Sequence, residues 1–318
     1  MKAQRGAAIL TAMLTVVLVA TLAASSLWQQ WRGVEIEAAE RSRTQSAWVL
    51  IGALDWARLI LREDARKGGA DHLGEPWAVP LAQARLSTFL AADRSNAQAA
   101  EDETQEAFLS GQMVDLQSRL NMTNLVQDAK IDETSLKAFK RLFKLLNLPE
   151  SELTALADKL RLAQDTHLDA KATAEAPLQP QTVDQLVWLG LSPRSLAVLR
   201  PFVTLLPVRT PVNLNTAPAE VVYACVESLA LADAHHLVDA RSASHLVTLA
   251  DAAKASGKAD APFNEALHSV TTRYFEVSGN LTVNQTTVQE QSVVQRDGMD
   301  VKTLTRNRGV APAIAPLQ

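Results

Sequence analysis

The sequence predicts an α+β protein in which a long N-terminal helix precedes an antiparallel sheet that a large all-helical domain interrupts. Three observations predict this fold: an apolar run without charge at residues 7–27, helix-forming segments at 126–260, and strand patterns on both sides of that block. The strands before and after the block can pair with each other, so the block is expected to be an insertion.

Seven parts follow from these patterns. We expect a leader at 1–6, a transmembrane helix at 7–27, its continuation at 28–62, the first part of the α/β domain at 63–125, the helical domain at 126–260, C-terminal strands at 261–308 and a disordered tail at 309–318.

The composition excludes several classes of protein. The 318 residues are 47% hydrophobic and 21% charged, which is typical of a chain that folds, and the net charge of −4 disfavours a nucleic-acid binder. A single cysteine, Cys225, excludes an intramolecular disulfide, and we interpret it as a small buried hydrophobic residue.

The N-terminus combines a short basic head with an apolar helix. Lys2 and Arg5 precede Gly6, and a helix over 7–27 would span about 32 Å, close to the thickness of a bilayer core. The basic head predicts a cytoplasmic N-terminus and an exported remainder. A cleaved secretory signal, ending near Ala24 or Ser25, is the alternative. No proline occurs from Leu27 to Leu61, so the helix is expected to continue past the membrane and to be retained.

Further along, local patterns predict individual elements. A loop follows residue 67, a strand-like stretch covers 112–125, and a helix with one apolar face covers 134–146. Ser151 is the expected N-cap of the next helix, a break at Ser192–Pro193 separates two short helices, and Pro218 is expected in the first turn of another. The C-terminal strands are expected to turn at Asp297–Gly298.

No catalytic motif emerges from the sequence. His235 and His236 are neighbours on a predicted helix and point about 100° apart, which favours a solvated face over a metal site. The segment 212–222 is similar to the start of a helix–hairpin–helix DNA-binding module, but no glycine follows before Ser256. We therefore expect Asn213 and Asn215 to hold a turn. The tryptophans expected in the core are Trp48, Trp56, Trp77 and Trp188.

Several runs, in this order, resemble one family over most of the chain: "RGAAILTAMLTVVLVATLA", "LDWARLIL", "EPWAVPL", "DLQSRLNMTNL", "RPFVTLLP", "VNLNTAPAEVV" and "YFEVSG". They resemble the K-class minor pseudopilins of the type II secretion system (general secretion pathway protein K). The resemblance implies that a prepilin peptidase cleaves between Gly6 and Ala7. It also implies a pilin-like sheet interrupted by a helical domain.

Thr11 departs from the pilin pattern. Pilins and major pseudopilins usually carry glutamate at the fifth mature position, where it is thought to pair with the N-terminal amine of a neighbouring subunit. Thr11 occupies this position here and offers no carboxylate, which suits a subunit at the filament tip.

The resemblance also raises the question of calcium. Family members carry an acidic run associated with bound calcium, and the matching region keeps Asp158 but has Lys159 and Arg161 in place of two family residues. Calcium prefers six to eight oxygen ligands. Asp158, Asp165, Asp169 and Glu175 are the candidate ligands, although the motif is degraded.

The resemblance implies a non-enzymatic subunit of the bacterial inner membrane, with a cytoplasmic N-terminus and a periplasmic bulk, that initiates and caps a pseudopilus. The implied partners are the I-class, J-class and H-class minor pseudopilins, the prepilin peptidase, the inner-membrane assembly platform and the lipid bilayer. A DNA-uptake pseudopilin or an exported DNA-binding protein is the alternative function.

Overall fold

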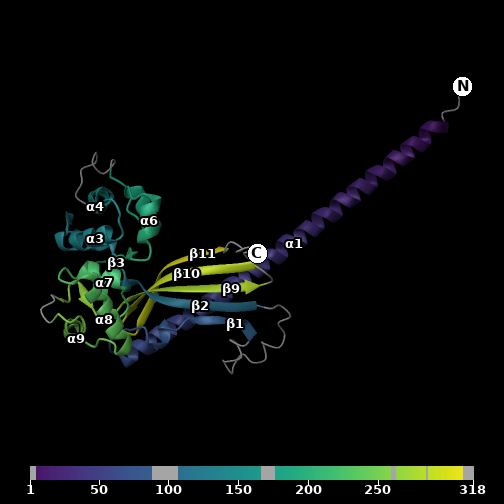
Figure 1. Ribbon diagram of the computed structural model, residues 1–318. Helices are drawn as coiled ribbons and strands as arrows, with labels where there is room; N and C mark the ends of the chain where they lie inside the picture. The colour runs from purple at the N-terminus through teal and green to yellow at the C-terminus, as the bar shows by residue number, and fades with distance from the viewer. Residues whose placement is uncertain (1–4, 88–106, 166–175, 259–262, 284–285, 311–318) are drawn as a thin grey trace. The chain divides into compact units, whose positions relative to one another are not determined.

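The computed structural model describes residues 5–87, 107–165, 176–258, 263–283 and 286–310. Contacts divide the chain into two compact units, Met1–Ala53 and Leu54–Gln318. Helix α1 (Arg5–Lys67) begins in the first unit and ends in the second, so it extends past the expected end at residue 62 (Figure 1).

The second unit contains one main sheet and a block of helices. The sheet consists of β1 (Leu81–Arg85), β2 (Ala107–Asp115), β9 (Tyr274–Val283), β10 (Thr286–Asp297) and β11 (Asp300–Val310). The block contains α3 (Glu133–Leu145), α4 (Glu150–Gln164), α6 (Pro193–Leu199), α7 (Ala219–Cys225), α8 (Leu231–Ala243) and α9 (Leu249–Ala255).

Short elements complete the second unit. The 3-10 helices are η1 (Pro76–Ala78), η2 (Leu116–Ser118), η3 (Met122–Leu125) and η4 (Val183–Leu189), and the two-residue strands are β3 (Leu120–Asn121), β4 (Val126–Gln127), β5 (Lys130–Ile131), β6 (Val203–Thr204), β7 (Val212–Asn213) and β8 (His268–Ser269). The expected strand over 112–125 is therefore partly wrong, because β2 begins at Ala107 and ends at Asp115.

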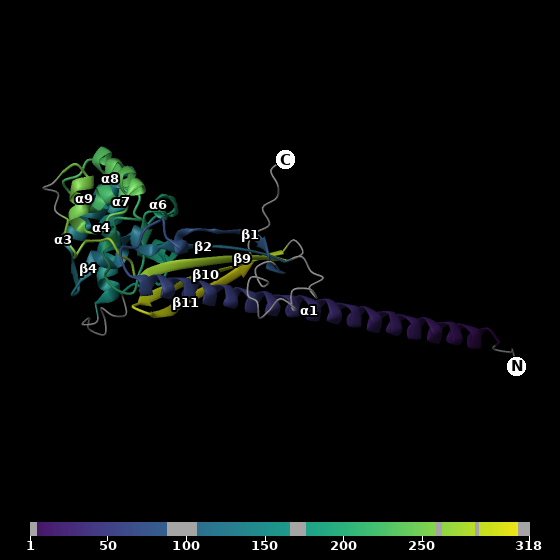
Figure 2. The same ribbon diagram turned by 90° about the horizontal axis from the view of Figure 1, so that it is seen from below.

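The strands on either side of the helical block pair as expected. The order in the main sheet is β1-β2-β9-β10-β11, and β2 runs antiparallel to β9 from Ala107 opposite Val283 to Asp115 opposite Phe275. Figures 1 and 2 show the helices α3, α4 and α6 to α9 gathered at one end of these strands. The helical block is thus an insertion between two neighbouring strands.

One core lies between the sheet and the last part of α1. Leu54, Ala57 and Leu61 repeat at helical spacing and are buried in one apolar cluster with Trp77 and Phe275. The rings of Trp77 and Phe275 meet edge to face, with centroids 5.1 Å apart. The last part of α1 therefore covers one face of the sheet.

The prediction that all four tryptophans are core residues is wrong for three of them. Trp77 is 1% exposed, whereas Trp48, Trp56 and Trp188 are 69%, 45% and 51% exposed. The reason is helical phase: Leu54 and Ala57 take the inward positions around Trp56, and Leu186 and Leu189 take those around Trp188.

A second core fills the helical block. The predicted helix over 134–146 is confirmed by α3, whose Phe139, Leu142 and Phe143 are buried against α4 and α7 side chains such as Leu156 and Val222. Apolar residues spaced three and four positions apart are sufficient to predict this helix.

Three boundaries differ from expectation. Ser151 is not an N-cap, because α4 begins at Glu150 behind Pro149, whose fixed φ and missing N–H suit a helix start. Pro218 is the N-cap of α7 rather than a residue of its first turn. Gly309 and Val310 belong to β11 and not to a disordered tail, and residues 311–318 lie outside the described residues.

Two turn predictions are confirmed. Ser192 caps α6, since its hydroxyl accepts a hydrogen bond from the Ser195 N–H, and Pro193 begins the helix. Asp297 pairs with Asp300 around Gly298, whose φ of +57° is the left-handed conformation that a tight hairpin needs at its first central residue.

Candidate functional site

The predicted cleavage residues lie at the start of α1. Gly6 and Ala7 are both within the helix, and the Thr11 hydroxyl donates a hydrogen bond to the Ala8 carbonyl oxygen at 3.0 Å. In the described part of the chain, one helix is long and apolar enough to cross a membrane; its span is Ala8–Lys67, with a mean hydropathy of 2.2 in the apolar window. Cleavage after Gly6 stays a prediction.

The calcium candidates are only partly described. Asp158 is exposed on α4 and Asp165 follows the end of that helix, while Asp169 and Glu175 lie outside the described residues. Within the described ranges, neither aspartate joins a group of three carboxylates, histidines or thiols with ligand atoms close enough to share an ion. The calcium site stays a prediction.

A different acidic group lies beside the sheet. Ligand oxygens of Asp64, Asp71 and Glu75 all lie within 4.8 Å of one another. The Arg296 guanidinium binds two of its three carboxyl groups: Nη1 donates to Asp64 Oδ2 at 2.6 Å, and Nη2 donates to Asp71 Oδ1. The Arg296 side chain is only 10% exposed, so the geometry is that of a buried ion-pair network that joins α1, the following loop and β10.

The main junction between the sheet and the helical block is built around Asp115, the last residue of β2. Its Oδ1 accepts hydrogen bonds from the Gln117 N–H at 2.7 Å and the Thr272 hydroxyl at 2.6 Å. Its Oδ2 accepts from Asn213 Nδ2 at 2.9 Å and the Thr216 hydroxyl at 2.6 Å. One carboxylate thus ties together the ends of β2 and β9 and a turn in the helical block.

Burial dominates the electrostatics of this junction. Asp115 is 2% exposed, and desolvation raises the pKa of its carboxyl, while the hydrogen bonds from Thr216, Thr272 and Asn213 act in the opposite direction. Burial also raises the pKa of Asp71, against the attraction of Arg296. Such a site is suited to holding segments together and offers no exposed acid or base.

The turn predicted at Asn213 and Asn215 is confirmed, and both side chains are used internally. Asn213 is fully buried, and its Oδ1 accepts from the Asn215 N–H at 3.0 Å. Asn215 exchanges two hydrogen bonds with the backbone of Leu246, at 2.9 and 2.8 Å. The similarity of this segment to a DNA-binding module therefore corresponds to a packed turn.

Other predicted sites behave as expected from the residues. His235 and His236 are exposed on α8, and His236 Nδ1 lies 2.9 Å from the Ala255 carbonyl oxygen. Cys225 is half-buried rather than fully buried; it packs against the helical core, and desolvation raises the pKa of its thiol to about 12. A thiol with this pKa stays protonated at neutral pH and is a poor nucleophile.

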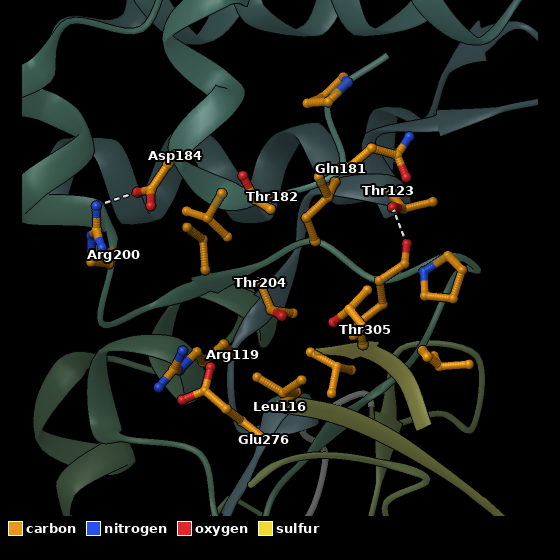
Figure 3. Close-up of a pocket in the computed structure, with 18 of the residues that line it drawn as sticks. Leu116, Arg119, Thr123, Gln181, Thr182, Asp184, Arg200, Thr204, Glu276 and Thr305 are labelled. Carbon is orange, nitrogen blue, oxygen red and sulfur yellow. Dashed lines mark hydrogen bonds and ion pairs between the residues drawn. The ribbon is translucent and has the colours of Figure 1, made fainter. Parts of the chain in front are cut away.

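A cleft of about 980 Å³ lies between the helical block and the C-terminal strands. Gln181, Thr182 and Asp184 face Leu116 and Glu276 across it (Figure 3). The Thr123 hydroxyl donates to the Leu206 carbonyl oxygen at 2.6 Å, and Asp184 pairs with Arg200. Among the described residues, the lining mixes leucines with amides, hydroxyls and charged side chains.

Glu75, in the loop after α1, is expected to make the stability of the protein depend on pH. Glu75 Oε2 accepts from Trp77 Nε1 at 2.7 Å and from the His72 N–H at 2.9 Å, and burial raises the pKa of Glu75 to about 7. The pKa of Glu75 in the folded protein is above its ordinary value of 4.5, so the protonated side chain contributes fully to the free energy of unfolding below about pH 4.5. This contribution is lost as the pH rises to about 7.

Glu75→Gln keeps an acceptor and cannot ionise, so we expect the variant to be the more stable of the two above about pH 7 and to lose this advantage towards about pH 4.5. Urea unfolding of both proteins across this range measures the difference. Burial lowers the pKa of His72, which acts in the opposite direction in both proteins and cancels in the comparison. Parallel pH profiles would contradict the assignment.

Comparisons with known proteins agree with this architecture. Two family models, both described as type II secretion system (T2SS), protein K, match residues 118–208 and 212–271. A protein of Pseudomonas aeruginosa, type II secretion system protein K, is 28% identical over 332 residues, covering 97% of this chain and 94% of the relative.

Among solved structures, a chain in the crystal structure of the GspK-GspI-GspJ complex from the enterotoxigenic Escherichia coli type 2 secretion system has the same fold. The TM-score is 0.64 at 19% identity, over 85% of this chain and 98% of that one. The two matched segments cover the helical insertion, and the relative extends the match to α1 and the sheet. The chain therefore belongs to the type II secretion system protein K family.

Proposed function

We propose that this protein is a minor pseudopilin at the tip of the type II secretion pseudopilus. It initiates and caps assembly and so supports the export of folded proteins across the outer membrane. In this proposal the apolar part of α1 anchors the chain in the inner membrane, with the N-terminus in the cytoplasm and the bulk in the periplasm. The protein has no enzymatic activity and acts through its surfaces.

The main support for this proposal is the position of the helical block, which is inserted between β2 and β9. Arg296, near the end of β10, binds Asp64 in the last turns of α1, and Asp115 ends β2 where the helical block begins. Within the second unit, the C-terminal end of α1 and the helical block thus lie at the same end of the sheet (Figure 2). A subunit added beyond that end would meet the helical block, which supports a capping role.

Thr11 supports a position at the tip. The hydroxyl donates to the backbone of its own helix and supplies no negative charge for the amine of another subunit. A carboxylate at the bilayer centre would cost about 2.5–3.5 kcal/mol unless it were paired. A subunit with Thr11 carries no such carboxylate and therefore needs no neighbouring amine above it.

The proposed partners are the I-class and J-class minor pseudopilins, because the similar solved chain belongs to a complex with GspI and GspJ. The H class, the prepilin peptidase and the inner-membrane assembly platform are further proposed partners. Co-purification of the full chain with tagged I-class and J-class proteins in detergent tests this, and we expect a stoichiometric complex. Failure to form any complex would contradict the proposal.

Processing gives a separate prediction. Coexpression with a prepilin peptidase is expected to yield a mature chain that begins at Ala7, and a chain made without the peptidase is expected to keep Lys2 and Arg5. N-terminal sequencing measures this directly. A start near Ala24 or Ser25 would instead indicate a cleaved secretory signal and would refute the retained helix.

The alternative is a DNA-uptake pseudopilin. The burial of Asn213 and Asn215 and the net charge of −4 argue against it. A salt-dependent affinity of the purified protein for DNA would support the alternative and contradict our proposal.

A further inference from the structure

Helix α1 changes character directly after its apolar run. Residues 7–27 carry no charge, and Trp28, Trp31 and Arg32 follow at once. The two indoles are 58% and 62% exposed, so they do not pack into the described part of the protein. Both rings are therefore accessible to an environment outside the chain.

The three side chains lie on one face of the helix. Trp31 and Arg32 follow Trp28 by three and four positions, the spacing at which helical side chains are neighbours. The Arg32 guanidinium carbon lies 4.6 Å from the centroid of the Trp28 ring, in cation–π geometry. The arrangement is a compact aromatic and cationic patch on a single turn.

The patch lies at a defined depth. A helix from Ala7 to Leu27 spans about 32 Å, so if the basic head stays on the cytoplasmic side, the next turn reaches the opposite edge of the hydrocarbon core. Indoles prefer that edge because their ring is apolar and their N–H needs a polar partner. A guanidinium there can bind lipid phosphate.

We propose that Trp28, Trp31 and Arg32 form an interfacial anchor that sits among the phospholipid headgroups of the periplasmic leaflet and fixes the depth of α1. The inference rests on the proposed membrane anchoring. Charge complementarity selects the headgroups as the occupant: Arg32 is the first charge after the apolar run, whereas acidic residues begin only at Glu35. The charged residue nearest to the lipid phosphates is therefore the cationic Arg32.

The test uses the full chain in vesicles of phosphatidylethanolamine and phosphatidylglycerol. Lipids brominated near the headgroup or near the acyl end quench tryptophan fluorescence at different depths. We expect shallow bromines to quench more than deep ones, and the Trp28→Phe/Trp31→Phe double variant to lose most of the shallow quenching. Trp48→Phe is the matched control, because Trp48 is a still more exposed residue of the same helix and lies about 25 Å beyond Trp31.

Arg32→Gln tests the cation separately. We expect it to reduce the shallow quenching in vesicles with phosphatidylglycerol. Unchanged quenching in the double variant, or stronger quenching by deep bromines, would overturn the anchor even if the protein still floats with the vesicles. Loss of flotation in the unmodified protein would instead refute the membrane anchoring itself, so the two failures are distinguishable.

Discussion

Asp115→Ala is expected to lower the free energy of unfolding by about 3–5 kcal/mol. The substitution removes a 2% exposed carboxylate and leaves its four donors without their acceptor: the Gln117 N–H, Asn213 Nδ2 and the hydroxyls of Thr216 and Thr272. Each buried donor without a partner costs about 1–3 kcal/mol, and the two threonine hydroxyls can recover part of this by rotating.

Urea unfolding of the full chain in detergent, followed by circular dichroism, measures the loss. Asp115→Asn keeps one acceptor oxygen, so we expect an effect between those of aspartate and alanine. Asp239→Ala is the control, since Asp239 is exposed on α8 and its removal is expected to change stability by less than about 0.5 kcal/mol. Equal effects of the alanine variants would show that the junction is not a stabilising network.

Arg296→Ala is expected to destabilise the protein by a similar amount, about 3–5 kcal/mol. Arg296 Nη1 and Nη2 donate to Asp64 and Asp71, and Nη2 also donates to the Thr272 carbonyl oxygen at 2.8 Å. The aspartate side chains are only 10% and 4% exposed. Without the guanidinium, two buried carboxylates beside Glu75 repel each other in a medium that screens them poorly.

The control for Arg296 is Arg273→Ala. Arg273 pairs with Asp297 at 3.2 Å, but the side chains are 54% and 69% exposed, so the pair is worth at most about 1 kcal/mol. Both variants are compared by urea unfolding at neutral and at mildly acidic pH. The defect of Arg296→Ala is expected to shrink at the lower pH, where the carboxylates take up protons. An Arg296 defect that does not depend on pH would contradict the charge argument.

The elements that could be predicted are those whose pattern is local. The helical face of α3, the break at Ser192–Pro193 and the turn at Gly298 each depend on residues within one short stretch. The insertion was predictable because strand patterns reappear after a long helical block. The exposures of Trp56 and Trp188 were not, since a shift of one residue turns a side chain by about 100° around the helix, which is enough to move it out of the core.

The junction around Asp115 could not be predicted in the same way. Its partners come from η2, from β7 and the turn after it, and from the segment before β9, and none of these residue types is unusual where it stands. The turn at Asn213 was visible in the sequence, but the buried carboxylate that it binds was not. Such a network is defined by tertiary structure, because its members meet only after the sheet has formed.

The insertion between β2 and β9 has a consequence for the order of folding. The neighbour of Asp115 in the sheet is Phe275, so the whole helical block must be made before the central strand pair can close. Contacts this distant form slowly, because closing a long loop costs entropy before the pairing stabilises anything. A chain that emerges with its N-terminus first therefore exposes the open edge of β2 while the helices fold locally. That edge is where we expect a newly made chain to be most prone to aggregation.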